Sequence, residues 1–319
     1  MKPLSVIVVG GGVSGLTCGV RLLELGHRVS LLAEAMGTAT TSGVAAALWF
    51  PYRAWPVEKV TEWGLRSLDR FRALADDPAT GVAFCEVVEV LEGVDDDPGW
   101  RALMEGFRPA RSDELAGPYR AGWALRLPMI ESDLYLPYLE RRFREGGGTI
   151  RIGSIRDWSE LPAADAVVNC AGLGARQLCS DPALVPVRGQ VLRASRGGIE
   201  RAVVDEGGAG HATYVIPRSK DVVLGTTTEP GRANLDPDPG QVADIRQRCE
   251  RLEPRTAALV VLEVKVGLRP GRPEVRVEAE QIGGRLVIHD YGHGGSGFTL
   301  SWGCAEEVAN LLRGGPPVE

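Results

Sequence analysis

The 319-residue sequence predicts an α/β fold in which a Rossmann-like nucleotide-binding domain is interleaved with a mixed-sheet α+β domain. Two observations support this fold class. The first 34 residues read as a complete strand–helix–strand unit, and similar apolar strand patterns return much later, near residues 166–170 and 285–289. Segments of different composition separate them, as expected when one domain is inserted into another. About two domains are expected at this length.

The N-terminal unit begins with residues 4–9, a short apolar run that ends at glycine. Such a run is typical of a strand that is buried on both faces of a parallel sheet. Residues 10–26 predict a helix, because apolar residues recur at helical spacing and Gly26 can end it. Residues 27–33 then predict the second strand.

The remaining elements follow in chain order. Residues 51–130 are richer in Trp, Pro, Arg and acidic residues than the N-terminal unit. A helix is predicted over 132–145, with Ser132 as its N-cap and glycines directly after it as the stop. The other predicted elements are helices over 57–74, 239–251 and about 299–312, and strands near 82–91, 123–127, 150–152, 166–170, within 186–228, over 259–266 and over 285–289.

A dinucleotide-binding motif lies at the junction of the first strand and helix. Residues 10–15, Gly-Gly-Gly-Val-Ser-Gly, fit G-x-G-x-x-G. In this motif Gly10 permits the tight turn, Gly12 lets a pyrophosphate approach the backbone, and Gly15 lets helix and sheet pack closely. Glu34 ends the second strand, where a carboxylate binds a ribose 2′-OH and repels a 2′-phosphate. The unit therefore predicts FAD or NAD rather than NADP, without distinguishing the first two.

Charge and cysteine content exclude several other classes. The formal net charge is −6 and no basic block occurs, so neither nucleic acid nor an anionic membrane is an expected partner. Six cysteines without a CxxC pair predict neither a zinc site nor a disulfide scaffold. His289 and His293 are separated by glycine, which disfavours the helix that would align them on a metal. We expect no metal, a cytoplasmic location, and either a monomer or a homodimer.

Five separated segments resemble the D-amino acid oxidase family and keep the family's order from residue 5 to about 310. The resemblance implies an FAD-dependent enzyme that holds its flavin non-covalently. It also implies oxidation of D-amino acids to 2-oxo acids and ammonia, with hydride transfer from the α-carbon to flavin N5 and reduction of O2 to H2O2. The segments are TTSGVAAALWFPY at 40–52, VNCAGLGA at 168–175, VRGQV at 187–191, GLRPGRP at 267–273 and HDYGHGGSGFTLSWGCA at 289–305.

The resemblance assigns roles on the substrate side. Arg269 corresponds to the arginine that grips the α-carboxylate through a two-pronged, charge-assisted hydrogen bond. Tyr214 corresponds to a tyrosine whose hydroxyl contacts the same carboxylate. The backbone carbonyl of Gly295 is expected to accept from the substrate amine. Trp49 and Tyr52 are expected to line the substrate pocket. No general base is required if the amine is neutral when it reacts.

The resemblance also assigns contacts to the flavin. Small hydroxylated residues after the second strand hold the FAD, and the C-terminal glycines let N–H groups approach the ring where negative charge develops. The hydroxyl of Thr299 is expected to contribute there. The predicted cofactor contacts are Gly10, Gly12, Val13, Ser14, Gly15, Glu34, Thr40, Thr41, Ser42, Ala46, Ala47, Ile155, Gly172, Arg269, His293, Gly294, Gly295, Ser296, Gly297, Phe298 and Thr299.

These assignments divide the chain into two domains. We predict a Rossmann-like FAD-binding domain built from residues 1–50, 131–185 and 266–319, and a substrate-binding domain built from residues 51–130 and 186–265. The small-molecule partners expected are a D-amino acid and O2.

Two departures from the family pattern bear on the substrate. A lid tyrosine of the eukaryotic members is replaced by Gly210 in a glycine-rich loop. The positions where D-aspartate oxidases carry side-chain-binding arginines fall near Val204 and Thr228, which are uncharged, so neutral or apolar D-amino acids are favoured. The alternatives are a glycine or sarcosine oxidase, a D-aspartate oxidase, an NAD-dependent dehydrogenase, and a dinucleotide-binding regulator without turnover.

Overall fold

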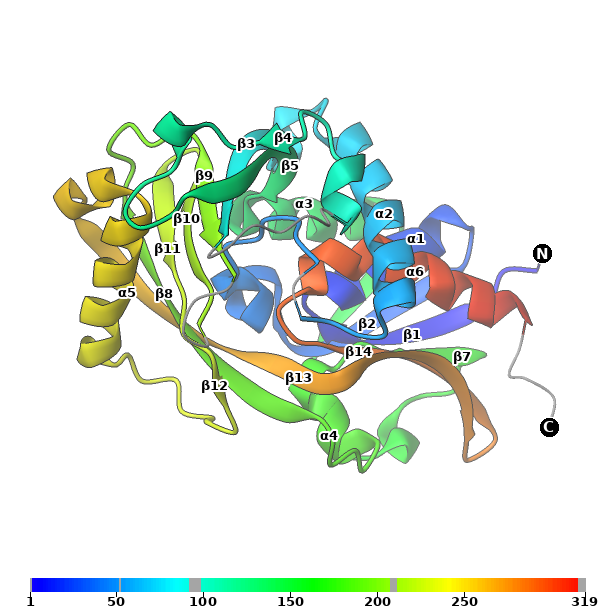
Figure 1. Cartoon of the computed structure of the whole chain (residues 1–319). Coiled ribbons are helices and arrows are strands. Elements are labelled where there is room, and N and C mark those ends of the chain that lie inside the picture. The colour runs from blue at the N-terminus through cyan, green and yellow to red at the C-terminus, as the bar shows by residue number, and fades with distance from the viewer. Residues whose placement is uncertain (1, 52, 92–98, 207–210, 315–319) are drawn as a thin grey trace.

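The computed structural model describes residues 2–51, 53–91, 99–206 and 211–314. Its strands form one continuous, strongly twisted sheet of 14 strands with helices packed against it (Figure 1). The order along the sheet is β4-β5-β3-β9-β10-β11-β8-β13-β14-β7-β1-β2-β6, and β12 pairs with β8 beside this path. The α/β fold class predicted from the sequence is confirmed.

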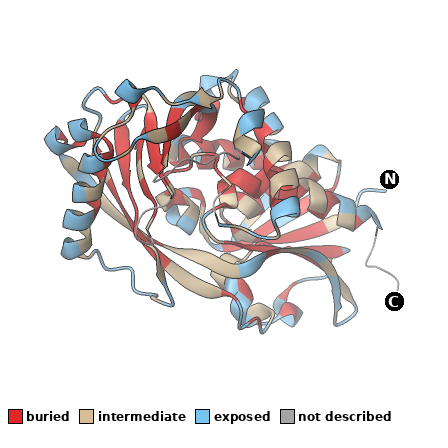
Figure 2. Ribbon diagram, viewed as in Figure 1, coloured by how far each residue is buried: buried red, intermediate tan, exposed pale blue. Residues whose placement is uncertain are grey.

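Five strands at one end of the sheet are mutually parallel and form the nucleotide-binding unit. The apolar side chains of residues 6–9 and 166–168 are almost fully buried, as the sequence predicted for strands covered on both faces, whereas Ile152 in the strand at the edge is exposed (Figure 2). Helices α1 (Val13–Glu24), α3 (Ser132–Glu145) and α6 (Gly297–Gly314) pack against one face. The strands, in spatial order, are β14 (Arg285–His293), β7 (Ala166–Asn169), β1 (Ser5–Gly11), β2 (Arg28–Met36) and β6 (Thr149–Ile152).

The other end of the sheet is antiparallel except where β3 and β9 run parallel. Helix α5 (Pro239–Leu252) covers its outer face, where Ile245, Cys249 and Leu252 are buried against the strands. Helix α2 (Val57–Leu74) instead packs on α6 and so links the two halves. The strands are β4 (Arg108–Pro109), β5 (Ala121–Ile130), β3 (Val82–Leu91), β9 (Ala202–Asp205), β10 (Thr213–Pro217), β11 (Asp221–Gly225), β8 (Val185–Ser195) and β12 (Glu229–Pro230).

Strand β13 (Val261–Ile282) joins the two halves. Its first part pairs with β8 up to Gly271, and its second part pairs with β14 from Gly271 onward. The sequence predicted that the strand ends near residue 266, and this was wrong. Pairing with β8 continues through the Gly-Leu-Arg-Pro segment, because cross-strand hydrogen bonds outweigh the local glycine and proline signals. The predicted domain boundary at 266 therefore falls inside a single strand, and the domain division stays a prediction.

Most predicted helices are confirmed, with shifted ends. Helix α1 begins at Val13, not at residue 10, because Gly10 has a φ of 123° and Gly11 still belongs to β1. Glu131 is the residue that precedes helix α3, and Ser132 is its first helical residue. Helix α6 is longer at both ends than predicted. Among the described residues, none of the helices combines the length and apolar character needed to cross a lipid bilayer.

Candidate active site

A cavity of about 590 Å³ lies where the parallel and antiparallel halves of the sheet meet. Its floor is formed by the carboxyl ends of parallel strands, the usual position of ligands in open α/β sheets. The β1–α1 turn, residues 39–48, the end of β7 and residues 293–299 line one half of it. Residues of β8, β9, β10 and β13 line the other half.

The glycine turn after β1 is held by close backbone packing. A Cβ on Gly10 would lie 2.1 Å from the carbonyl oxygen of Cys170, and one on Gly15 would lie 1.9 Å from the carbonyl oxygen of Gly10. Gly10, Gly12, Val13 and Ser14 line the cavity, whereas Gly15 acts behind it by allowing the turn to form. The turn thus leaves backbone N–H groups at the start of α1 open to the cavity, which suits a diphosphate.

The hydroxyls of residues 40–42 also shape this half. Ser42 Oγ accepts from the Val13 N–H at 3.0 Å, so it stabilises the start of α1. Thr40 Oγ1 donates to the Gly37 carbonyl at 2.6 Å, and Thr41 Oγ1 donates to the Leu268 carbonyl at 3.1 Å. These two hydrogen bonds hold the segment in place, while the same residues line the cavity.

Other predicted cofactor residues gather along this half of the cavity. Glu34 at β2, Ile155 after β6 and Gly172 after β7 all line it, as do Ala46 and Ala47. The carboxylate of Glu34 is exposed, at the position the sequence predicted for a ribose partner. The fit to a dinucleotide therefore rests on the backbone N–H donors that line this half and on the space that larger side chains at the glycines would fill.

Residues 293–299 complete the cofactor side. His293, Gly294, Gly295, Gly297, Phe298 and Thr299 line the cavity, and Ser296 is fully buried away from it. Thr299 Oγ1 donates to the Phe50 carbonyl and accepts from the Phe50 N–H, both at 3.0 Å. In this arrangement the hydroxyl proton is directed to the Phe50 carbonyl, and the contact of the Thr299 hydroxyl with the flavin stays a prediction. The open N-terminus of α6 is the donor set that remains.

Behind this segment, a buried carboxylate orients His293. Asp290 accepts from His293 Nε2 at 3.0 Å and from Cys18 Sγ at 3.3 Å. Hydrogen bonding to Cys170 and burial raise the pKa of the Cys18 thiol well above its usual value, and burial raises that of Cys170 to about 11. Both thiols therefore remain protonated at neutral pH. They stabilise the Asp290 carboxylate as hydrogen-bond donors. This role is structural, although Cys18, Cys170 and Asp290 together also have the composition of a metal site.

On the opposite wall, the Arg269 side chain lies over Gly189 and the Tyr214 side chain lies over Gly225. Arg269 donates to the Thr227 carbonyl at 3.0 Å and to Thr226 Oγ1 at 2.9 Å. A Cβ on Gly189 would lie 2.3 Å from the Arg269 guanidinium, and one on Gly225 would lie 2.3 Å from the Tyr214 ring. The neighbouring strands therefore leave space in which both side chains line the cavity.

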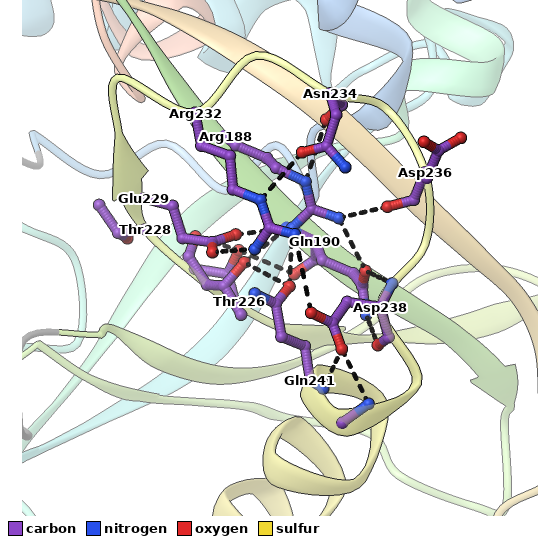
Figure 3. A network of polar contacts seen from close by, with 12 residues as sticks. Arg188, Gln190, Thr226, Thr228, Glu229, Arg232, Asn234, Asp236, Asp238 and Gln241 are labelled. Carbon is purple, nitrogen blue, oxygen red and sulfur yellow. Dashed lines mark hydrogen bonds and ion pairs between the residues drawn. The ribbon is translucent and has the colours of Figure 1, made fainter.

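A buried ionic network supports the two threonines that hold Arg269 (Figure 3). Its centre is Arg188, whose side chain is fully buried and whose guanidinium lies among acceptors on all sides. The guanidinium donates to Glu229 at 2.6 Å, to Gln241 Oε1 at 2.7 Å, and to the carbonyls of Asp236 at 2.6 Å and Asn234 at 3.0 Å.

The network reaches Arg269 through Gln190. Its side chain accepts from Arg188, its backbone N–H donates to Thr227 Oγ1 at 2.9 Å, and its carbonyl accepts from Thr226 Oγ1 at 3.1 Å. Arg188 thus fastens the 226–241 segment over β8. The sequence indicated the segment containing Arg188 but gave no local signal that this residue supports Arg269.

Glu206 is a cavity residue that the sequence analysis missed. It follows β9 and lines the same wall as Tyr214. Its Oε2 lies 3.6 Å from Arg101, whereas its buried Oε1 has no hydrogen-bond partner among the described residues. Burial raises the pKa of Glu206 to about 7, with a further contribution from the Glu89 carboxylate. The feature of the sequence that could have identified Glu206 was a carboxylate directly after an apolar strand.

The two aromatic residues expected in the substrate pocket have different outcomes. Trp49 is only 1% exposed, and its indole donates to the Gly64 carbonyl at 3.1 Å. It is a core residue and does not line the cavity, so this expectation was wrong. Its neighbours Leu48 and Phe50 line the cavity instead, since successive side chains of an extended segment point to opposite sides. Tyr52 and Gly210 lie outside the described residues.

Comparisons with known proteins identify the family. The family model described as FAD dependent oxidoreductase, abbreviated DAO, matches residues 5–311. The chain belongs to this family. It is 48% identical over 308 residues to a D-amino-acid oxidase of Rubrobacter xylanophilus, covering 96% of this chain and 94% of the relative. It is 44% identical to a D-amino-acid oxidase of Streptomyces coelicolor, covering 96% of each chain.

More distant relatives share the same architecture. A human D-aspartate oxidase is 36% identical, with 98% of this chain and 95% of the relative covered. Among solved structures, glycine oxidase from Geobacillus kaustophilus superposes with a TM-score of 0.81 at 18% identity, covering 98% of this chain and 95% of that one. The resemblance predicted from five sequence segments is therefore confirmed. The protein is an FAD-dependent oxidoreductase, and its cofactor is a flavin.

Proposed function

We propose that the protein is a D-amino acid oxidase that converts neutral and apolar D-amino acids to 2-oxo acids and ammonia. The observation that carries this proposal is the joint lining of one cavity by the dinucleotide turn and by Arg269 with Tyr214. When bound non-covalently, FAD supplies the hydride acceptor at N5 and passes the electrons to O2, giving H2O2. The close relatives named D-amino-acid oxidase support the same reaction.

Arg269 would bind the substrate carboxylate. Thr226 and Thr227 fix the guanidinium from one side, so its planar fork has a set orientation before the substrate arrives. A planar guanidinium matches a carboxylate through two parallel hydrogen bonds, and Tyr214 would add a third. Two fixed anchors hold the α-carbon in one orientation, which is how positioning lowers the barrier.

The amine and the developing charge would be handled by the backbone. The carbonyl of Gly295 would accept from the substrate amine, and the N-terminus of α6 favours negative charge on the cofactor side of the cavity. Asp290 is occupied by His293 and two thiols, which leaves it no role as a base. Departure of the α-hydrogen as hydride from a neutral amine is consistent with this arrangement.

Apolar side chains support the proposed preference for neutral substrates. Leu48, Phe50, Val204 and Ile216 line the cavity on the substrate side. Val204 is one of the two positions at which an arginine would favour acidic substrates, and it presents an isopropyl group to the cavity. Thr228, the second such position, is not among the cavity-lining residues. A D-aspartate oxidase activity is therefore disfavoured.

The decisive test combines a spectrum with a paired substrate panel. The purified protein should show an oxidised flavin spectrum that denaturation releases into solution. It should release peroxide from D-norleucine and D-valine, and much less from their L-enantiomers, glycine or sarcosine. Turnover confined to glycine and sarcosine would replace the proposal with a glycine oxidase, and a flavin that is never reduced under anaerobic conditions would leave a non-catalytic binder.

Arg269→Lys tests the anchoring step in the same assay. The charge remains but the two-pronged geometry is lost, so kcat/KM for D-norleucine should fall by about a hundredfold. The flavin should remain bound, because the glycine turn and residues 293–299 that line the cofactor side are unchanged. Unchanged kinetics in this variant would contradict the proposed role.

We also propose a cytoplasmic location. Its support is that all six cysteines are free thiols, four of them buried, as suits a reducing compartment. Expression with a fluorescent tag in a native host would test this. The homodimer considered from the sequence stays a prediction, which sedimentation velocity would test.

A further inference from the structure

A cysteine, a histidine and a glutamate form a row beside the carboxyl ends of β7 and β14. Asn169 ends β7, and His289 is its register partner in β14. Cys179 directly follows the short helix α4 (Ala175–Leu178), and its Sγ lies 3.8 Å from His289 Nδ1. Glu280 of β13 lies on the other side of the ring, 3.0 Å from His289 Nε2. The order of thiol, imidazole and carboxylate is the one that activates cysteine nucleophiles.

Hydrogen bonds hold the histidine in the form that this chemistry needs. The Glu280 carboxylate accepts from Nε2, so Nδ1 is the ring atom that carries the lone pair. The Asn169 amide donates to Nδ1 and to Cys179 Sγ, each at 3.2 Å, and so also stabilises negative charge on the sulfur. Burial and the nearby Arg276 lower the pKa of His289. The ring is therefore neutral at pH 7 and can accept the thiol proton.

Cys179 combines partial exposure with a neighbouring base. Four of the six thiols are buried, and Cys85 is the other partly exposed one. Burial raises the pKa of Cys85 to about 12. Burial also raises the pKa of Cys179, against the opposing effects of the Tyr291 hydroxyl and Arg276, so this thiol is protonated at rest. Its reactivity must come from transfer of the proton to His289 and not from a standing thiolate.

The groups around the row are joined to one another by hydrogen bonds. They come from β13, β14 and the turn after α4, and they are Arg272, Arg276, Glu278, Glu280, Asp181 and Tyr291. Burial works to raise the pKa of Asp181, but hydrogen bonds from Arg272 and Tyr291 outweigh it and lower the pKa. Burial raises the pKa of Tyr291. Asp181, Tyr291 and the two arginines therefore keep their charge state near neutral pH.

We propose that Cys179 is a peroxide-reactive thiol, with His289 as its proton acceptor and Glu280 as the residue that positions the imidazole. The thiol proton moves to His289 Nδ1, the sulfur attacks one peroxide oxygen, and the O–O bond breaks. The leaving hydroxide takes the proton back from the imidazolium. One thiol and one H2O2 thus give a sulfenic acid and water, with the sulfur oxidised by two electrons and the peroxide reduced.

The position of Cys179 places it close to the source of that peroxide. Leu178, directly before it, lines the cavity. Asn169 accepts from the Ala171 N–H at 3.2 Å, and Ala171 lines the cavity too. The thiol therefore lies just behind the wall of the cavity in which H2O2 is the expected product. The proposal rests on the proposed oxidase function for its oxidant, whereas the arrangement of Cys179 and His289 does not depend on it.

Peroxide added to the resting protein tests the site without turnover. With excess dimedone to trap sulfenic acid, peptide mass spectrometry should find the label on Cys179 and not on Cys85. The labelling rate should change by less than about twofold between pH 6.5 and pH 8, because the neutral imidazole takes the proton throughout this range. A wild-type rate that rises by about tenfold per pH unit is that of a thiol without a base, and it overturns the proposal. Absence of the label on Cys179 does so as well.

Variants of the row test each partner. His289→Gln should lower the labelling rate at pH 7 by about a hundredfold, and the remaining rate should rise by about tenfold per pH unit with the thiolate fraction. Glu280→Ala should lower the rate by about tenfold and introduce a pH dependence, because the imidazole is no longer held toward the thiol. Glu278→Ala is the matched control, since this carboxylate also binds Arg276 but not His289, and it should keep the wild-type rate. Equal rates in the two glutamate variants overturn the role of Glu280.

A turnover experiment separates this proposal from the oxidase function. Wild-type protein that oxidises D-norleucine in air should acquire the label on Cys179, and added catalase should prevent it. If D-norleucine yields no peroxide, the oxidase proposal fails, and added peroxide still decides the role of Cys179. If D-norleucine yields peroxide but added peroxide leaves Cys179 unlabelled, the oxidase proposal stands and this one fails. The wild-type pH series needs no variant, so it decides even if His289→Gln does not fold.

Discussion

The two halves of the cavity are built on opposite principles. The cofactor half, from the β1–α1 turn to residues 293–299, is formed by backbone that glycines bring close together. The other half contains the Arg269 guanidinium beside apolar side chains, with Arg269 fixed by threonines and these by the buried Arg188 network. In the first half geometry is set by backbone contacts, such as that of Gly10 with the Cys170 carbonyl. In the second half it is set by side-chain contacts between strands far apart in the chain.

This difference predicts how each half fails. An added methyl group at Gly10 or Gly15 meets backbone that cannot move away, so the turn itself is lost. Loss of a charged side chain in the half that contains Arg269 leaves the backbone in place and weakens the support of Arg269 gradually. Substitutions in the first half should therefore abolish flavin binding, and those in the second should change KM, kcat/KM or stability with the flavin retained.

The largest effect is expected from Gly15→Ala. Its Cβ would lie 1.9 Å from the carbonyl oxygen of Gly10, a contact that only a shift of the turn can relieve. The N–H groups at the start of α1 would no longer converge, and the protein should purify without flavin. The ratio of flavin to protein absorbance measures this. Gly314→Ala, where an added Cβ has open space, should retain the full flavin content.

A smaller effect is expected from Arg188→Ala. It leaves Glu229 and two backbone carbonyls without their buried donor, a change that costs about 3 kcal/mol of unfolding free energy in comparable cases. The 226–241 segment should loosen, and KM for D-norleucine should rise by about tenfold while the flavin stays bound. Unfolding by urea and steady-state kinetics give the two readouts.

Arg232→Ala is the matched control for this change. Arg232 also pairs with Glu229, but its side chain is 40% exposed. Exposed ion pairs contribute about 1 kcal/mol or less, so stability and KM should remain close to those of the wild type. If both variants behave alike, the buried network does not position Arg269.

The same contrast explains what could be predicted from the sequence. The glycine turn and Glu34 were found because a local spacing encodes them, and the C-terminal glycines were found through the family resemblance. Arg188, Gln190 and Thr226 were not, because their relation exists only after β8, β11 and β13 pair. Trp49 was misplaced for a related reason, since the sequence does not show which side of an extended segment faces the cavity.

The length of β13 also depended on partners. Its glycines and prolines predicted an end near residue 266, but the ladder with β8 carries the strand past Arg269. Arg269 is therefore presented from within a strand, where its backbone pairs with Val187 of β8. The family resemblance predicted the residue and its chemistry, and strand pairing determined its support.

The smallest effect is expected in acid. Burial works to raise the pKa of Glu229, but hydrogen bonds from Gln241, Arg232 and Arg188 outweigh it and lower the pKa to about 2. A carboxylate with a lowered pKa stabilises the fold above its unfolded pKa of about 4.5, and this contribution is lost as pH falls toward 2. Glu229→Gln should therefore flatten the decline of thermal stability between pH 4.5 and pH 2.

Glu114 provides the comparison that links this pH effect to function. Hydrogen bonding from Arg108 lowers the pKa of Glu114 to about 2 as well, but its partners Arg108, Arg111 and Arg201 are not part of the network around Arg188. Glu114→Gln should flatten the acid decline in the same direction without changing KM. Glu229→Gln should raise KM by a few fold in addition, because Arg188 loses a charged partner. An equal KM in the two variants would show that the acid-sensitive network and the carboxylate anchor are independent.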